Sequence, residues 1–343
     1  MLSSPRLTII VAAPLIVLSF AVAGDQRVRL LPKFTTGEIL RYEISTRMTT
    51  SGVTTSPIEN PEGASRLKQT VDMLIRLDIL DAQPGTGTAM GRVHLRATYE
   101  KSDATSETDA YDPQAAAAAD QYARLRSRSV EFIIEPGGKL SSITGLEDVL
   151  SNPSMAQSVR SWMTGLSSGA GVPPDGIVLG QKWSNEQPLT STPLAGLVWR
   201  TDATYLRNES CRAAASTQTG APTAAAPVAS DELCAVILTR FEILRRGSRD
   251  DPTPEDYRRN SLRTSGTWAG NGESLDSISL SSGMVISSTQ TSTQNINLQI
   301  TSTRSGSRVA YTGHVETQTE IRLLPPVPAQ SPAQPPPQAQ PQP

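Results

Sequence analysis

The chain has 343 residues, of which 31 are lysine or arginine and 33 are aspartate or glutamate, giving a formal net charge of −2. Because the two signs nearly balance and no basic stretch stands out, nucleic acid is excluded as an expected partner. Aromatic residues make up 4% of the chain, while serine, threonine and β-branched residues are abundant. This composition is typical of strands with one face in water.

Residues 1–23 have the pattern of a secretory signal peptide. Arg6 supplies a positive charge, Leu7–Phe20 is an apolar run, and Ala21–Ala23 is a small-x-small cleavage signal. The alternative is an uncleaved membrane anchor, although the apolar run is at the short end of the roughly 17–25 residues that a spanning helix needs. No later segment is long and apolar enough to span, so we expect a periplasmic or extracellular protein without a membrane span after cleavage.

The two cysteines, Cys211 and Cys234, are expected to form a disulfide in an exported protein. In the chain-entropy model, a disulfide that closes a loop of this size stabilises the fold by roughly 3 kcal/mol. A reactive or metal-binding pair is the alternative, but no further cysteine and no nearby histidine completes a zinc set. We therefore expect no metal and no cofactor.

Alternation of apolar and polar residues predicts three long strands in the first part of the chain, Ile39–Thr49, Leu67–Leu80 and Thr88–Tyr99. His94 falls on the polar side of the third strand, where a solvated histidine is the simplest interpretation. The acidic stretch Ser102–Asp112 predicts a polar loop. A calcium-binding loop is the alternative, but the spacing of the acidic residues does not fit one.

Two helices are predicted. The first covers residues 113–126, where an aspartate and a proline precede an alanine-rich run. The second covers residues 153–167, and its apolar residues recur at helical spacing on one face. We expect this second helix to pack on a sheet, either as core or as the lid of an apolar cavity. The candidate lid residues are Met155, Val159, Trp162 and Leu166.

Two similar hairpins suggest an internal duplication. Glu131–Ser142 and Asp276–Ser287 each read as a strand, a tight turn with glycine at its end, and a second strand. Leu238–Leu244 also resembles Leu74–Leu80, with polar and apolar positions matched, and the segment after Gly196 resembles the one after Gly37. The alternative is chance similarity between amphipathic strands.

The expected architecture is mainly β (a β-rich α+β fold), with long antiparallel strands in one or two curved sheets. Residues 24–190 would form the first β-unit and residues 191–324 the second. The cysteines would then clip the base of the loop Arg207–Leu233 between two antiparallel strands. Residues 325–343 are rich in proline and glutamine, so we expect a disordered tail.

Several shorter signals complete the second half. Gly270–Gly272 and Ser305–Ser307 are predicted hairpin turns. Thr253–Asp256 is predicted to begin a short helical turn with a capping box. Met284–Thr303 and Arg308–Leu323 are predicted strands, and His314 on the second of these has no evident partner.

One motif formally matches a hydrolase signature. Gly165–Gly169 reads G-x-S-x-G around Ser167, but a nucleophile elbow needs a strand before the serine and a helix after it. Here a predicted helix ends and a loop follows, so we assign no catalytic residue.

Three motifs carry a resemblance to known proteins. The first strand, G-E-I-L-R-Y-E at Gly37–Glu43, the hairpin F-I-I-E-P-G-G-K-L at Phe132–Leu140, and V-L-G-Q-K-W at Val178–Trp183 resemble exported bacterial β-proteins of unknown function. More distantly, the pattern is similar to the lipoprotein-carrier fold. That resemblance implies a curved antiparallel sheet with helices against its concave side and an apolar concavity for acyl chains, and it assigns no functional residue.

The sequence therefore predicts an exported, non-enzymatic envelope protein that acts as a binding or structural module. One alternative is a periplasmic carrier of lipid or lipoprotein, whose partner would be a hydrophobic ligand or an envelope component. Another is an envelope hydrolase, which would need carboxylates that the fold brings together.

Overall fold

The computed structural model describes residues 27–55, 65–85, 91–109, 113–136, 140–146, 159, 163, 171–173, 175–189, 192–211, 232–247 and 251–325. The predicted signal peptide, Gly165–Gly169 and all of the predicted tail except Pro325 lie outside these residues. No helix in the described part of the chain is long and apolar enough to cross a membrane.

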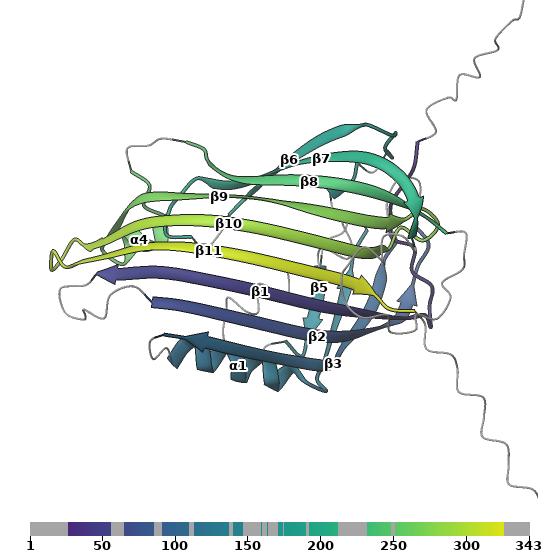
Figure 1. Cartoon of the computed structure of the whole chain (residues 1–343), viewed down its shortest axis with the longest axis horizontal. Helices are drawn as coiled ribbons and strands as arrows, with labels where there is room; N and C mark the ends of the chain where they lie inside the picture. Colours follow the sequence, from purple (N-terminus) through teal and green to yellow (C-terminus); the bar gives the residue numbers. More distant parts are fainter. Residues whose placement is uncertain are drawn as a thin grey trace, which may run out of the picture.

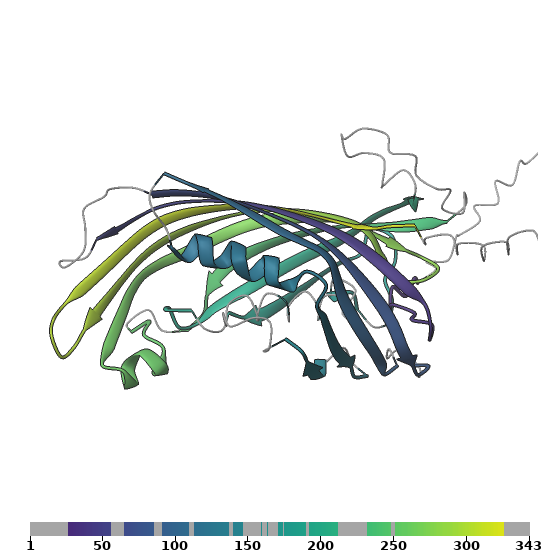
Figure 2. The same cartoon turned by 90° about the horizontal axis from the view of Figure 1, so that it is seen from below.

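Eleven strands form one antiparallel sheet, which confirms the mainly β prediction and gives one sheet rather than two. Figure 2 shows that the sheet is arched, with helix α1 (Pro113–Leu125) on its concave side. In chain order the strands are β1 (Ile39–Thr55), β2 (Ser65–Ala82), β3 (Val93–Thr108), β4 (Ser129–Ile134), β5 (Leu140–Thr144), β6 (Lys182–Pro188), β7 (Leu197–Ser210), β8 (Leu233–Arg245), β9 (Leu262–Ser279), β10 (Val285–Ser302) and β11 (Arg308–Leu323).

The order of strands across the sheet is β5-β4-β3-β2-β1-β11-β10-β9-β8-β7-β6. The chain begins in the middle of the sheet, meanders to one edge, restarts at the opposite edge and meanders back (Figure 1). The first and last strands therefore pair with each other, with Tyr42 opposite Leu323. The sheet stays open, because β5 and β6 are edge strands.

The sheet order bears on the predicted duplication without deciding it. β1–β2–β3 and β7–β8–β9 cross the sheet in the same direction, and each strand lies five places from its counterpart. The two similar hairpins, however, are β4–β5 and β9–β10, which this correspondence does not align. β6, at the end of the predicted first unit, pairs with β7 of the second. The duplication remains a prediction.

Side chains alternate between an inner, concave face and an outer face, as the period-2 pattern predicts. The largest core cluster occupies the inner face of β1–β4 and is covered by Leu125 of α1 and by Met163, both fully buried. Its strand residues are Leu40, Tyr42, Ile44, Ile75, Leu77, Ile79, Val93, Leu95, Ala97, Tyr99, Val130, Phe132 and Ile134.

Two smaller apolar clusters lie on the inner face of the other half of the sheet. One is built on β7–β9 and is closed by Leu30 and Ile177, which belong to two short segments joined by a β-bridge at Val28. The other joins Leu197 and Leu298 with residues around them on β7–β10. Three apolar clusters thus hold one continuous sheet.

The predicted turn at Gly270–Gly272 is wrong, because these residues lie within β9. A Cβ atom on Gly272 would lie 2.4 Å from the ring of Phe241, and one on Gly313 would lie 2.3 Å from the hydroxyl of Tyr311. Rings from these inner-face residues thus occupy the space that a side chain would need. Both glycines are there for close packing rather than for a turn.

Two other local predictions need correction. The acidic stretch Ser102–Asp112 is not all loop, because β3 runs on to Thr108 by pairing with β2. The register places the acidic residues Asp103 and Glu107 on the outer face, while Ser102 is fully buried opposite Met73. The helical turn α4 (Glu255–Arg259) forms, but Pro254 occupies its N-cap and no side chain caps it. The Thr253 hydroxyl instead accepts a hydrogen bond from the backbone N–H of Thr264, at 3.0 Å.

The predicted disulfide is confirmed. Cys211 follows β7, Cys234 lies in β8, and their Cα atoms are 5.0 Å apart. The antiparallel pairing of β7 with β8 places Glu209 opposite Cys234, so the register itself brings the two cysteines together. Both cysteines are buried.

Candidate binding groove on the outer face

The described part of the predicted lid packs as core. Val159 is half-buried and contacts the large cluster. Met163, one helical turn further on, is fully buried, and the sequence prediction missed it although its spacing from Val159 fits the same helical face. Met155, Trp162 and Leu166 lie outside the described residues.

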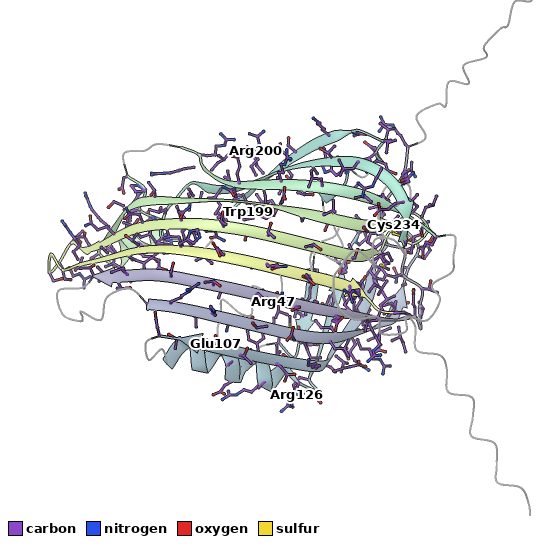
Figure 3. All side chains as sticks on the ribbon, in the orientation of Figure 1. Arg47, Glu107, Arg126, Trp199, Arg200 and Cys234 are labelled. Carbon is purple, nitrogen blue, oxygen red and sulfur yellow. A yellow bond between two sulfur atoms is a disulfide. The ribbon has the colours of Figure 1, made fainter. Side chains whose placement is uncertain are left out.

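A wide hollow of about 910 Å³ lies over the middle of the sheet and is lined mainly by outer-face side chains. We call it the outer groove. Figure 3 labels Arg47 and Arg200 on opposite sides of the strands that form its floor. Its lining residues come from β1 and β7–β11 and are Arg47, Thr49, Asp202, Arg240, Phe241, Glu242, Asn271, Gly272, Glu273, Thr291, Ser292, Thr293, Glu316, Thr317 and Gln318.

Strand register arranges the outward side chains of the groove in rows that run across the strands. One row joins residues that lie opposite each other on six successive strands, and we call it the central row. Its members are Arg47, Gln318, Thr291, Glu273, Arg240 and Asp202. The neighbouring row consists of Thr49, Glu316, Thr293, Asn271, Glu242 and Arg200.

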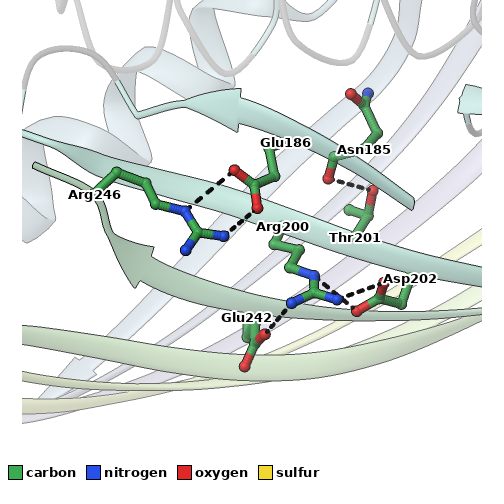
Figure 4. Close-up of polar contacts among 7 residues, drawn as sticks. All are labelled: Asn185, Glu186, Arg200, Thr201, Asp202, Glu242 and Arg246. Atoms are coloured by element: carbon green, nitrogen blue, oxygen red, sulfur yellow. Dashed lines mark hydrogen bonds and ion pairs between the residues drawn. The ribbon is translucent and has the colours of Figure 1, made fainter.

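The charged side chains at the β7–β8 side of the groove form ion pairs with one another (Figure 4). The Arg200 guanidinium lies 3.2 Å from Asp202 and 3.7 Å from Glu242. Beside them, Arg246 pairs with Glu186, and this hydrogen bond holds the pKa of the Glu186 carboxyl below its usual value. Asp202 and Glu242 thus share one cation, as ordinary surface ion pairs do.

Other polar groups in and beside the groove are also satisfied. His314 lies 2.8 Å from the Asn295 side chain on β10 and 3.1 Å from Glu316, so the expectation that it has no partner is wrong. Asn295 comes from the neighbouring strand, which sequence proximity cannot reveal, whereas Glu316 is two residues away on the same strand. The Thr293 hydroxyl donates to the Asn271 side chain at 3.2 Å.

The predicted solvated position of His94 agrees with its half-exposed place on the outer face. Its ring lies 3.4 Å from Glu131, which also accepts a hydrogen bond from Arg96 at 2.8 Å. The Arg96 hydrogen bond is the main cause of a lowered pKa at Glu131. Ion pairs of this kind recur across the outer face, which is therefore polar and in contact with water.

Four side chains of the central row have no partner among the described residues. Within the part of the chain that the structure describes, the side chains of Arg47, Arg240, Glu273 and Thr291 make no hydrogen bond and no ion pair, and all four are exposed. They come from β1, β8, β9 and β10, of which the last three are consecutive in the chain. Sequence reasoning could not add Arg47 to this group, because only the pairing of β1 with β11 brings it into the row.

The groove also differs from the inner face in its ring side chains, since Phe241 is the only aromatic residue among those that line it. The aromatic residues of the described strands lie on the inner face, as their register and packing show: Tyr42, Tyr99, Phe132, Trp183, Trp199, Tyr205, Phe241, Trp268 and Tyr311. Trp199 and Phe241 stack there with ring centroids 4.8 Å apart. The outer groove thus offers charge, hydroxyl and amide groups to a ligand.

No protein-family model matches the chain, and no curated protein matches it. The chain is similar to a lipovitellin structure that concerns lipid–protein interactions, with a TM-score of 0.39 and 14% identity over 87% of this chain and 27% of that one. It is also similar to the outer membrane protein OprG from Pseudomonas aeruginosa, with a TM-score of 0.17 and 6% identity over 85% of this chain and 99% of that one. For OccK8 (OprE) from the same organism the TM-score is 0.16 and the identity is 7%, over 86% and 100% of the two chains.

The chain thus spans about a quarter of the length of the lipovitellin chain. TM-scores this low do not establish a shared fold, and no function is transferred from these proteins.

Proposed function

We propose that this chain is an exported, non-enzymatic binding module of the cell envelope, with the outer groove as its ligand surface. The observation that carries the proposal is the central row, in which Arg47, Glu273 and Arg240 line one hollow without a partner among the described residues. Elsewhere on the outer face, several charges form ion pairs, such as Arg41 with Glu100 and Arg96 with Glu131. Unpaired charges gathered in a hollow are the groups that an incoming ligand can use.

Export is supported by two independent features. Residues 1–23 have the pattern of a signal peptide, and Cys211 and Cys234 form a disulfide. Disulfides persist in oxidising compartments outside the cytoplasm. Together they support a periplasmic or extracellular location.

Co-sedimentation with envelope fractions tests the proposal. The mature protein is mixed with purified cell-wall sacculi and, separately, with vesicles of envelope lipids from its own host. We expect retention on one fraction, and we expect the double variant Arg47→Gln/Arg240→Gln to reduce it. Arg76→Gln, on the outer face of β2 away from the groove, is the matched control. Retention on neither fraction would overturn the proposal.

A carrier of lipid or lipoprotein is the second candidate, and the inner face supports it. The rings of the described strands gather there, and Met48, Val315 and Tyr311 are half-buried inner-face residues outside the three apolar clusters. Native mass spectrometry of protein purified from its own host tests this candidate. A co-purifying lipid or peptide would support it, and a bare protein would count against it.

The hydrolase alternative finds less support in the groove. Among the acidic residues that line the groove, Asp202 and Glu242 lie closest together in register, and both contact Arg200. A general acid needs a carboxyl whose surroundings favour the protonated form, and a shared guanidinium does the opposite.

A further inference from the structure

The geometry points to a particular class of ligand for the outer groove: an extended peptide of mixed charge that lies across the strands, with acidic side chains near its two ends and a basic one between them. This inference rests on the proposed binding function and names the ligand that the central row would recognise.

Distances along the central row set the length of the ligand. Arg47 on β1 and Arg240 on β8 are separated by β11, β10 and β9, which makes four strand-to-strand steps. At 4.7–4.9 Å for each step, their Cα atoms lie ~19 Å apart. An extended chain advances about 3.3–3.6 Å for each residue, so about six steps, or seven residues, cover this distance. Successive side chains of an extended chain point to opposite faces, so every second residue faces the groove.

The sequence of charges along the row sets the order of groups in the ligand. Starting from β8, the row presents the guanidinium of Arg240, the carboxylate of Glu273, the hydroxyl of Thr291, the amide of Gln318 and the guanidinium of Arg47. A complementary peptide has an acidic residue at Arg240, a basic residue two positions further on at Glu273, polar residues over the middle strands and a second acidic residue at Arg47, six positions from the first. Complementarity of this kind gives specificity more than raw affinity.

Two features favour a peptide over a saccharide or a polyanion. No described strand residue projects an aromatic ring from the outer face, and the one ring that lines the groove, Phe241, is only 5% exposed, so a sugar has almost no ring surface on which to stack. The carboxylates of Glu273 and Glu316 line the same groove as the two arginines and would repel a ligand with only negative charge. A peptide supplies both charges and backbone amides for the Thr291 hydroxyl and the Gln318 amide.

Binding of designed peptides tests the inference. The probe is the end-blocked heptapeptide Asp-Ser-Lys-Ser-Ser-Ser-Asp with a fluorophore, measured by anisotropy against the full mature protein at low salt. The comparison peptides are its scramble, Ser-Asp-Asp-Ser-Ser-Lys-Ser, and its charge inversion, Lys-Ser-Asp-Ser-Ser-Ser-Lys. We expect the probe to bind more tightly than either comparison peptide and to lose affinity as salt rises.

Substitutions in the protein then locate the site. We expect Arg47→Gln, Arg240→Gln and Glu273→Gln each to weaken the probe by about two- to fivefold, the range for exposed charge pairs. We expect Glu273→Lys to weaken the probe further. Arg76→Gln is the control and should leave the affinity unchanged. Because these side chains are exposed, unchanged melting curves can confirm that each variant is folded.

The possible outcomes separate this inference from the proposed function. Equal affinity for the probe and its scramble, or an equal loss with Arg76→Gln, would overturn the peptide inference. If wild-type protein is retained on sacculi but excess probe does not release it, the binding module stands and the peptide class is wrong. Release by the probe but not by the scramble would support a peptide displayed on the cell wall as the natural ligand. Binding of the probe without retention on sacculi would support a free peptide.

Discussion

Asp276 is an acidic residue placed where a charge is costly. Its side chain on β9 is 7% exposed and accepts hydrogen bonds from Ser288 at 2.5 Å and from Ser274 at 3.0 Å. On the neighbouring strand β8, the described inner-face side chains beside it are Ile237 and Thr239, neither of which carries a charge. Burial raises the pKa of the Asp276 carboxyl above its usual value, and the two serine hydrogen bonds offset only part of that effect.

This pKa predicts how stability changes with pH. Because the folded pKa lies above the unfolded value, the folded state holds its proton more tightly, and stability falls as pH rises from the unfolded pKa through the folded one. Asp276→Asn removes the cost of the buried charge. We expect the variant to be more stable than wild type at pH 8, on the order of 1 kcal/mol, with the difference vanishing near pH 3. Urea denaturation across this range measures the effect, and parallel pH profiles would contradict the prediction.

Cross-strand packing explains a glycine that sequence reasoning would call a weak point. Gly313 on β11 pairs with Gly52 on β1, and the Tyr311 ring lies over both. A glycine within a strand costs conformational entropy, but here its missing side chain makes room for an aromatic ring. The entropic cost of Gly313 and the packing gained from the Tyr311 ring must therefore be assessed together for the pair β1–β11.

A double-mutant cycle tests this packing. We expect Gly313→Ala to destabilise the protein by about 1–3 kcal/mol, because the new methyl group overlaps the Tyr311 ring. In the background of Tyr311→Leu, the same substitution should become neutral or stabilising, since alanine is the better strand residue once the ring is gone. Thermal or urea melts of the four proteins give the coupling energy. Additive effects would show that the ring and the glycine are independent.

The connection between β7 and β8 depends on its disulfide. Cys211 and Cys234 are 23 residues apart in sequence and close the base of a loop whose ends the two strands already bring together. We expect reduction, or the double variant Cys211→Ser/Cys234→Ser, to cost roughly 3 kcal/mol. Calorimetry with and without reducing agent should show a lower melting temperature, while circular dichroism should retain the strand signal. An unchanged melting temperature would contradict this expectation.

Sequence patterns predicted a strand most accurately where apolar and polar residues alternate along it. Alternation identified β11 to the residue, and the turn at Ser305–Ser307 before it is confirmed. The pattern failed where pairing overrides composition. Ser102–Thr108 looks like loop but pairs with β2, and Gly270–Gly272 looks like a turn but makes room for an aromatic ring.

The outer groove could not be predicted for a different reason. The groove residues without a side-chain partner are ordinary charged and polar residues, and nothing in the sequence around Arg47 or Glu273 identifies them as part of a binding site. Their grouping depends on the register across β8, β9 and β10 and on the pairing of β1 with β11, which are distant in the chain. The local signals needed for the disulfide, by contrast, were two cysteines at the ends of strands already predicted to be neighbours.

The sheet as a whole is held by one pairing that is very distant in sequence. β1 pairs with β11 in the middle of the sheet, and every other neighbouring pair of strands is consecutive in the chain. Tyr42 lies opposite Leu323, so the two halves join only when the ends of the chain meet. Closing such a long loop costs entropy before any contact repays it, which makes this pairing the expected slow step of folding.

A circular permutant can remove this step without changing the fold. A Gly/Ser linker of about 15 residues joins Pro325 to Arg27, and the chain is opened between Met163 and Gly171, in the connection from β5 to β6. All neighbouring strands are then consecutive in the chain. We expect the permutant to reach the same circular dichroism spectrum and to refold at least about tenfold faster in stopped-flow measurements.

The control permutant carries the same linker but is opened at Gly306, between β10 and β11. It makes β1 and β11 consecutive and turns β10 with β11 into the distant pair, so one long-range closure remains. We expect no comparable acceleration in this control. If both permutants fold at the wild-type rate, closure between β1 and β11 does not limit folding. If both fold faster by the same factor, the linker itself is responsible, because the two chains differ only in whether a distant strand pair is left to close.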